Sequence, residues 1–159
     1  MIEVHPRLYV GALEDCRAAG GGWAVIHACK TPCHQAAVGY KGSLPKDDPS
    51  YLVLRRGDEL FLNIIDPPVP LFQMQSFGAF MAFVSEQLQK DVDLLIHCNQ
   101  GLSRAPSLAL LAMAFRLRAL PDGSYSAARE AFQIIHPGYS PGAGIARFLT
   151  DNWEAVRRL

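Results

Sequence analysis

A cysteine and an arginine six positions apart are the residues of this chain best suited to do chemistry. Cys98 and Arg104 enclose a short polar segment, and an apolar run at 92–96 before it predicts a buried strand. The apolar run at 105–115 after it predicts a buried helix. The loop between a strand and a helix N-terminus points backbone N–H groups at an anion. The pattern therefore predicts an anion site that holds a thiol nucleophile and a guanidinium.

The side chains of this segment favour a phosphoryl group as the anion. A helix N-terminus and a nearby cation stabilise a thiolate, so we expect Cys98 to be largely ionised at neutral pH. Arg104 would offer two parallel donors to phosphoryl oxygens. His97 is expected to orient the loop by hydrogen bonding, and Ser103 either to donate to the thiolate or to hold the loop shape. The predicted phosphate-binding residues are Asn99, Gln100, Gly101, Leu102, Ser103 and Arg104.

A second catalytic group is needed, because the oxygen that leaves a phosphoester must take up a proton. Asp66 is the leading candidate, since it ends a run at 61–66 that predicts a buried strand, and Pro67-Pro68 terminates that strand. From there its carboxyl group could overhang a neighbouring loop. The alternative interpretation is that Asp66 only begins a turn. Other aspartates lie in a predicted hairpin or in a polar loop, namely Asp58, Asp47 and Asp48.

The segment His97–Ser107 resembles the signature of the protein tyrosine phosphatase superfamily, especially its small dual-specificity branch. Asp66 stands roughly thirty residues before the cysteine, as the general acid of that branch does. Further segments that resemble the branch are Leu8-Tyr9-Val10-Gly11-Ala12, Ile135-His136-Pro137, Ser140-Pro141-Gly142-Ala143-Gly144, Phe148 and Trp153. The resemblance implies Cys98 as nucleophile, Arg104 as phosphate binder, and Asp66 as the acid that later becomes the base for water attack. It implies no cofactor.

Two residues depart from the pattern of that branch. Ala105 stands where the family usually has a serine or threonine, whose hydroxyl helps the cysteine leave the phosphoenzyme. Ser107 lies two positions further along the predicted helix and is expected to face elsewhere. Gly142 stands where the branch often has an asparagine. We therefore expect hydrolysis of the phosphoenzyme to be slow, and a phosphate-binding module without turnover remains the alternative function.

The whole chain, 159 residues of which 50% are hydrophobic, predicts one globular domain over residues 1–159. Predicted strands lie at Trp23–Cys29, Tyr51–Arg55, Phe61–Ile65 and Asp93–His97. Predicted helices lie at Gln73–Lys90, Ala105–Arg118, Ser124–Ile135 and Gly144–Arg158. This alternation indicates an α/β fold with a central, mostly parallel or mixed sheet of about four to five strands flanked by helices. Residues 31–50 are predicted to form a long surface loop.

Charge and cysteine usage limit the expected partners, cellular compartment and metal binding of the protein. The formal net charge of zero gives no basic surface for nucleic acid or anionic membrane, so neither is an expected partner. The N-terminal residues lack a signal-peptide core, and thiol chemistry suits a reducing cytoplasm. The segment Cys29–His34 contains zinc-ligand types but no second ligand pair, so no metal is expected. On oxidation Cys98 could pair with a second cysteine, which is left open among Cys16, Cys29 and Cys33.

The loop interior indicates the class of substrate. Superfamily members that act on inositol phospholipids commonly carry lysines between the cysteine and the arginine, whereas this loop is neutral there. We expect a phosphorylated protein or peptide, or a small phosphomonoester, with phosphotyrosine favoured and phosphoserine or phosphothreonine possible. Free phosphate or sulfate is also expected to fit the loop. Arsenate reduction is disfavoured, because no resolving cysteine follows Cys98.

Overall fold

A six-stranded mixed sheet forms the centre of the molecule in the computed structural model, which describes all 159 residues. The strands are β1 (Ile2–His5), β2 (Leu8–Gly11), β3 (Ala24–His27), β4 (Val53–Arg56), β5 (Glu59–Leu62) and β6 (Leu94–His97). They lie in the order β1-β2-β6-β3-β5-β4. The four inner strands are parallel, and β1 and β4 pair antiparallel at the edges. The α/β prediction is confirmed, with six strands rather than four or five.

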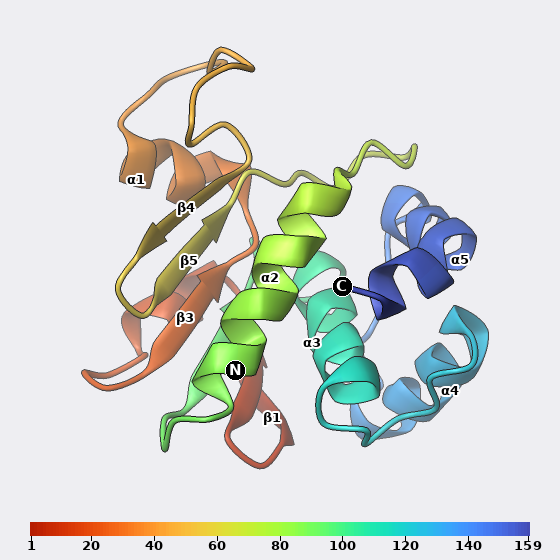
Figure 1. Cartoon of the computed structure of the whole chain (residues 1–159). Coiled ribbons are helices and arrows are strands. Elements are labelled where there is room, and N and C mark those ends of the chain that lie inside the picture. Colours follow the sequence, from red (N-terminus) through yellow and green to blue (C-terminus); the bar gives the residue numbers. More distant parts are fainter.

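The longer helices all lie on one side of this sheet (Figure 1). They are α2 (Met74–Gln87), α3 (Arg104–Phe115), α4 (Tyr125–Ile135) and α5 (Ala143–Arg157). Buried α3 packs on β2 and β6, because its residues from Ala105 to Ala114 are apolar except for Ser107. The longest helix, α5, has 15 residues, and no helix is long and apolar enough to cross a membrane.

The opposite face of the sheet has a thinner cover of short helical turns. These are η1 (Leu13–Arg17), η2 (Lys30–His34) and α1 (Gln35–Val38). A small separate core lies under them, formed by Cys29, Cys33 and Phe61 with Leu13, Ala37 and Leu54 against it. Successive strand residues face opposite sides, so Ile26 and Ile96 enter the main core while their neighbours His27 and His97 turn to this second face.

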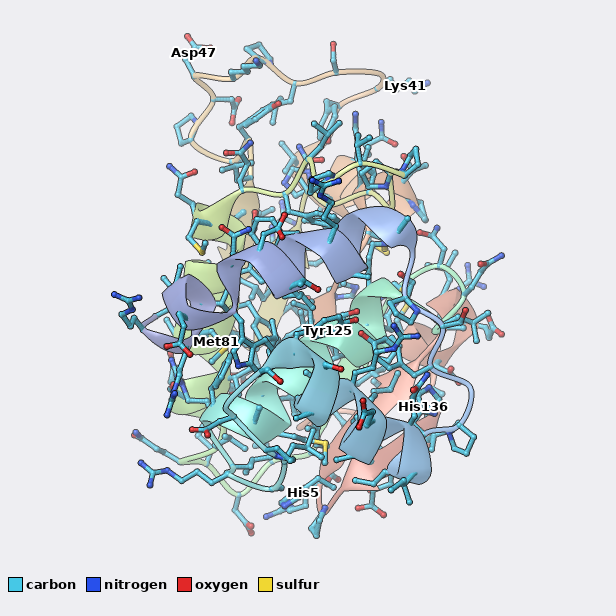
Figure 2. The ribbon with its side chains drawn as sticks, turned by 90° about the vertical axis from the view of Figure 1, so that its right-hand side faces the viewer. His5, Lys41, Asp47, Met81, Tyr125 and His136 are labelled. Carbon is cyan, nitrogen blue, oxygen red and sulfur yellow. The ribbon has the colours of Figure 1, made fainter.

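The prediction of a surface loop over residues 31–50 is wrong for its first half. Proline, glycine and charged residues suggested a loop, yet Cys33 is 9% exposed and His34 is fully buried. Both ring nitrogens of His34 are used, by the Tyr40 hydroxyl and the Ser50 carbonyl group. Only the part after α1 extends from the body of the molecule, and Figure 2 shows it with Lys41 and Asp47 labelled.

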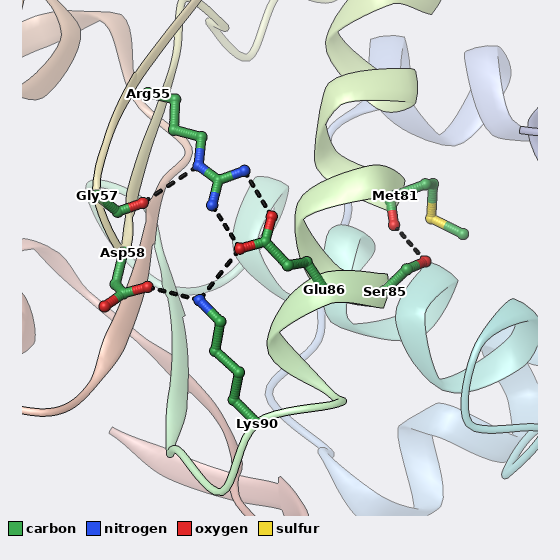
Figure 3. Close-up of polar contacts among 7 residues, drawn as sticks. All are labelled: Arg55, Gly57, Asp58, Met81, Ser85, Glu86 and Lys90. Carbon is green, nitrogen blue, oxygen red and sulfur yellow. Dashed lines mark hydrogen bonds and ion pairs between the residues drawn. The ribbon is translucent and has the colours of Figure 1, made fainter.

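The predicted hairpin around Asp58 is present between β4 and β5, and Gly57 in its turn has φ of +57°. Ion pairs join this hairpin to α2 (Figure 3). Arg55 donates two hydrogen bonds of 2.6 Å to the Glu86 carboxylate. Lys90 lies 2.9 Å from an Asp58 oxygen and 3.1 Å from Glu86. The antiparallel edge is therefore fixed to the helical layer.

The strand predicted over 61–65 ends earlier, at Leu62. Asn63 N–H still bonds to Leu52 opposite it, whereas Ile64 N–H bonds back to Leu62, so the backbone leaves the sheet at Ile64. The carbonyl group of Ile64 is thereby free of the sheet and accepts from Lys30 N–H at 3.0 Å. This extended segment carries the chain to Asp66 at the carboxyl end of the parallel strands.

Candidate functional site

The predicted anion loop lies where the parallel strands end. Gly11, His97 and His27 are paired across the last positions of β2, β6 and β3. The loop of residues 98–103 follows β6 and leads into α3, which begins at Arg104. Open α/β folds bind ligands at this edge, beyond the carboxyl ends of the strands. The local pattern in the sequence therefore located the loop correctly.

The loop wraps around the sulfur of Cys98. Gly101 N–H donates to Cys98 Sγ at 3.3 Å, and Cys98 itself is 2% exposed. Gly101 has φ of +72°, and a Cβ atom there would lie 3.0 Å from the Gly11 carbonyl carbon and oxygen. Only glycine satisfies both conditions at low cost. This residue thus lets the backbone turn inward so that an N–H group faces the sulfur.

Arg104 crosses the site and is held by oxygen atoms on three segments. Its Nη1 donates to the carbonyl groups of Ala28 and Ile64, each at 3.1 Å, and its Nη2 donates to Asn99 Oδ1 at 2.7 Å. Its Nε is buried and has no partner. Since Nη2 also has a second N–H, the guanidinium retains the two kinds of donor that a bidentate phosphate contact uses.

Neighbouring segments hold the rim of the loop by backbone hydrogen bonds. Leu13 N–H donates to the Asn99 carbonyl group at 3.2 Å, and Ser140 N–H donates to that of Leu102 at 2.9 Å. Ser103 Oγ accepts from Gly142 N–H at 2.9 Å. Of the two roles expected for Ser103, this contact matches the one that holds the loop shape. The Leu102 side chain is 44% exposed at the rim.

Asp66 is exposed and lies beside the last loop, against Gly142. A Cβ atom at Gly142 would collide with Asp66 Oδ1 and would stand 3.0 Å from its Cγ. A Cβ atom at Gly144 would collide with the Pro67 carbonyl oxygen. The two glycines therefore let the segment from Asp66 to Val69 approach the start of α5. Gly142 also donates its N–H to Ser103, so Gly142 alone stands between Asp66 and the anion loop.

His97 begins a chain of side-chain contacts that runs through buried His27 on β3 to exposed Glu59 on β5. Its Nε2 lies 2.7 Å from His27 Nδ1, and His27 Nε2 lies 3.2 Å from Glu59 Oε1. Burial lowers the pKa of both histidines to about 4, so both rings are neutral at pH 7. In the tautomer in which His27 Nε2–H donates to the Glu59 carboxylate, His27 Nδ1 accepts from His97 Nε2–H. This chain agrees with the orienting role predicted for His97.

The helix position after Arg104 offers no hydroxyl group. Ala105 is fully buried. The nearby Ser107 hydroxyl forms a hydrogen bond of 2.8 Å with the Tyr139 hydroxyl. The Tyr139 hydroxyl also lies 2.9 Å from the Tyr125 hydroxyl. Burial raises the pKa of Tyr139, so this cluster of hydroxyl groups is uncharged. Ser107 is thus engaged in the core behind the loop.

A polar groove of about 530 Å³ is lined by the segment at Asn63–Ile65. None of residues 98–104 lines it, and its link to the anion loop is Ile64, whose carbonyl group accepts from Arg104. Its wall also includes Ser43, Leu44 and Lys46 of the long loop after α1. Lys30 from η2 adds a second cation to the same cleft.

The fold is shared with known phosphatases, although no family model and no curated protein matches the sequence. The human tyrosine phosphatase-like serine/threonine/tyrosine-interacting protein is 22% identical, with a TM-score of 0.64 over 99% of this chain and 97% of that one. Human DUSP28 is 18% identical, with a TM-score of 0.62 over 98% and 94%. Cydia pomonella PTP-2 phosphatase is 16% identical, with a TM-score of 0.65 over 95% and 88%.

The fold is therefore that of the protein tyrosine phosphatase superfamily, and it resembles the small dual-specificity phosphatases. Solved structures match 98–99% of this chain in several cases, so the likeness includes the segments before and after the anion loop. At these low identities the comparisons concern the fold.

Sequence reasoning missed three groups around the loop. His27 and Glu59 lie far from Cys98 in the chain. His27 contacts both His97 and Glu59 because β3 is the neighbour of both β6 and β5. His136 is 4% exposed. Burial lowers its pKa, and this outweighs a hydrogen bond with the Gly101 backbone, which raises it. The only available signal was the presence of histidines in apolar surroundings, which does not name their partners.

Proposed function

We infer that this protein is a cysteine-dependent phosphomonoester hydrolase of the tyrosine or dual-specificity type. The observation that carries this inference is the pairing of a sulfur that accepts a loop N–H at 3.3 Å with an arginine whose buried Nε lacks a partner. Both groups face the anion that such a loop binds. The shared fold supports the same class of activity.

The residues give a two-step reaction. The Cys98 thiolate attacks phosphorus, an S–P bond forms, and the P–O bond to the leaving group breaks as Asp66 supplies the proton. Arg104 and the N–H groups of residues 99–104 stabilise the charge on the transferring group. Water then attacks phosphorus while the Asp66 carboxylate takes its proton, and the thiolate leaves with the S–P electrons.

A phosphorylated protein or peptide is the proposed substrate, with phosphotyrosine preferred. The exposed Leu102 side chain offers apolar surface for an aromatic ring at the rim. The groove with Lys30 and Lys46 would receive residues that flank the phosphorylated one, and its cations suit acidic neighbours. The four free cysteines support the reducing cytoplasm as the compartment.

A phosphate-binding module with little turnover is the second candidate, and Ala105 favours it. This residue is fully buried and supplies no hydroxyl group to the departing thiolate in the second step. In that case the loop would still bind phosphotyrosine but would release product very slowly.

Hydrolysis of a small aryl phosphate from pH 5 to 8 separates the two candidates. We expect Cys98→Ser to abolish activity and Asp66→Asn to lower kcat by roughly 10²–10⁴-fold, the usual contribution of a general acid. Asp58→Asn, in the distant hairpin, is the matched control and should leave kcat unchanged. A wild-type chain that binds phosphate or vanadate without hydrolysing the ester would establish the binding module instead.

A further inference from the structure

Three side chains beneath the anion loop have the types and the spacing of a soft-metal site. The Sγ atoms of Cys29 and Cys33 and a ring nitrogen of His97 all lie within 4.8 Å of one another. Cys29 and His97 are fully buried, and Cys33 is 9% exposed. Two sulfurs and a nitrogen around one zinc ion stand about 3.5–4 Å apart, from their usual bond lengths in tetrahedral sites. Small side-chain movements would close these three groups on an ion.

The fold supplies the ligand that the sequence lacked. Cys29 follows β3, and the turn of η2 after it is closed by a hydrogen bond of 3.1 Å from His34 N–H to the Cys29 carbonyl group. This turn brings Cys33 back beside Cys29. His97 comes from β6, which pairs with β3. His34, the third zinc-ligand type in the sequence motif, is instead engaged with Tyr40 and Ser50.

The hydrogen-bond chain through His27 leaves a lone pair on His97. When Glu59 accepts from His27 and His27 Nδ1 accepts from His97 Nε2, the His97 Nδ1 carries no proton. In that tautomer the 3.4 Å contact between Nδ1 and the Cys98 carbonyl oxygen joins two acceptors and is not a hydrogen bond, so the Nδ1 lone pair is free for an ion. Metal-bound histidines commonly donate their other N–H to such a chain ending in a carboxylate. In that tautomer His97 already has, through His27, the second-shell contact of a histidine that binds a metal by Nδ1.

A cavity of about 550 Å³ on the second face of the sheet reaches this cluster at Cys33, with Cys29 and His97 buried behind it. Cys33 and His27 contribute to its wall together with Cys16, and Glu14 and Arg17 lie on it as charged groups. No residue of the anion loop lines this cavity, so it leads to Cys33 separately from the phosphate site, and it has room for a water molecule as a further ligand.

We propose that Cys29, Cys33 and His97 bind one zinc ion, with water as the fourth ligand. Binding releases the thiol protons to solvent, because thiolates are the ligands. His97 directly precedes Cys98, so an occupied site would fix the ring behind the nucleophile. A second set, Cys16, His27 and His97, also lies within 4.8 Å. It is disfavoured because its two imidazoles already share the 2.7 Å hydrogen bond.

The test is a titration of the reduced full-length chain with zinc against a chromophoric chelator. We expect one zinc ion per chain, and we expect Cys33→Ser and Cys29→Ser each to weaken binding at least about 100-fold, more than loss of a second-shell contact. Cys16→Ser is the matched control, since it removes a thiol from the same cavity but not from the proposed set, and should leave the affinity unchanged. Thermal melting of each metal-free variant checks that it folds.

Cobalt(II) provides a readout that needs no variant. The wild-type chain with one equivalent of cobalt(II) should show the sulfur-to-cobalt charge-transfer absorption of thiolate ligands. The absence of this absorption would overturn the proposal. A fall in zinc affinity with Cys98→Ser but not with Cys33→Ser would place the ion on the nucleophile and would also overturn it. Loss of binding with Cys16→Ser alone would assign the ion to the second set. None of these outcomes depends on phosphatase activity.

Discussion

The anion loop has two sides that are built differently. Above it, the rim consists of exposed residues and glycines, and its contacts are mainly backbone hydrogen bonds from Leu13, Ser140 and Gly142. Below it, the buried rings of His97 and His27 contact each other, and His27 contacts the exposed Glu59. The rim can therefore admit a ligand without large rearrangement, whereas the underside fixes the ring next to the nucleophile. Changes on the two sides should affect different quantities, namely turnover above and stability below.

Among the changes that compare the two sides, Arg104→Lys should have the largest effect, because Arg104 joins them. A lysine has no planar fork to bind the Ala28, Ile64 and Asn99 oxygens together with a phosphoryl group. We expect kcat/KM for an aryl phosphate to fall by roughly 10²–10³-fold, as on removal of a transition-state donor. Arg56→Lys is a control at an exposed arginine outside the loop. Equal activity of Arg104→Lys and wild type would refute the role of the guanidinium.

Acid should destabilise the protein through the underside. His27 and His97 have pKa values of about 4 when folded, against 6.5 as the ordinary value. The unfolded chain therefore binds more protons between these values, and the free energy of unfolding falls as the pH drops from about 6.5 to 4. With about 1.36 kcal/mol for each pKa unit, the loss is about 3 kcal/mol per histidine.

Denaturant unfolding at pH 7.5, 6 and 5 measures the part of this loss that occurs above pH 5. His27→Gln removes one of the two titrating rings, and its unfolding free energy should depend less steeply on pH than that of wild type. A wild-type stability that is flat from pH 7.5 to 5 would show that the buried rings do not control it.

Gly142→Ala should affect the rim alone. The added Cβ collides with the Asp66 carboxylate, so Asp66 must move. We expect kcat to fall by roughly 10–100-fold, as misplaced catalytic groups typically cause, while the melting temperature changes little. Gly138→Ala is the matched control, because its Cβ would lie 3.6 Å from the nearest His136 atom, an ordinary contact. An equal loss in both variants would point to a general effect on the last loop.

Ala105→Ser should have the smallest effect and the opposite sign. A hydroxyl group at this buried position could assist departure of the thiolate, so turnover should rise by about tenfold, or ~1.4 kcal/mol in the barrier. The wild-type chain should show a pre-steady-state burst of product, and the variant should lose it. A wild-type chain without a burst would mean that hydrolysis of the phosphoenzyme is not the slow step.

The sequence predicted the parts of the site that are contiguous in the chain. The strand, loop and helix around Cys98 lie within about twenty residues, and their apolar pattern and polar interruption are local signals. The helices α2 to α5 were also located to within a few residues, because long apolar or amphipathic patterns set their faces. The short edge strand β1 was missed, since four residues with two exposed hardly form a pattern.

The parts that could not be predicted depend on packing between distant segments. Nothing in the sequence around Gly142 indicates that its missing side chain makes room for Asp66. In the same way Cys33 looked like part of a polar loop, although a turn buries it beside Cys29. Composition describes the average environment of a segment, whereas these contacts depend on which strands become neighbours.

The backbone hydrogen bonds at Asn99 and Leu102 have a further consequence for how this site can vary. Both anchors use carbonyl oxygens, at 3.2 Å and 2.9 Å, which every residue type possesses. The curve of the loop therefore does not depend on the Leu102 side chain, which projects from it and is 44% exposed. Descendants of such a chain could exchange that side chain and recognise a new phosphoester while the anion cradle kept its form.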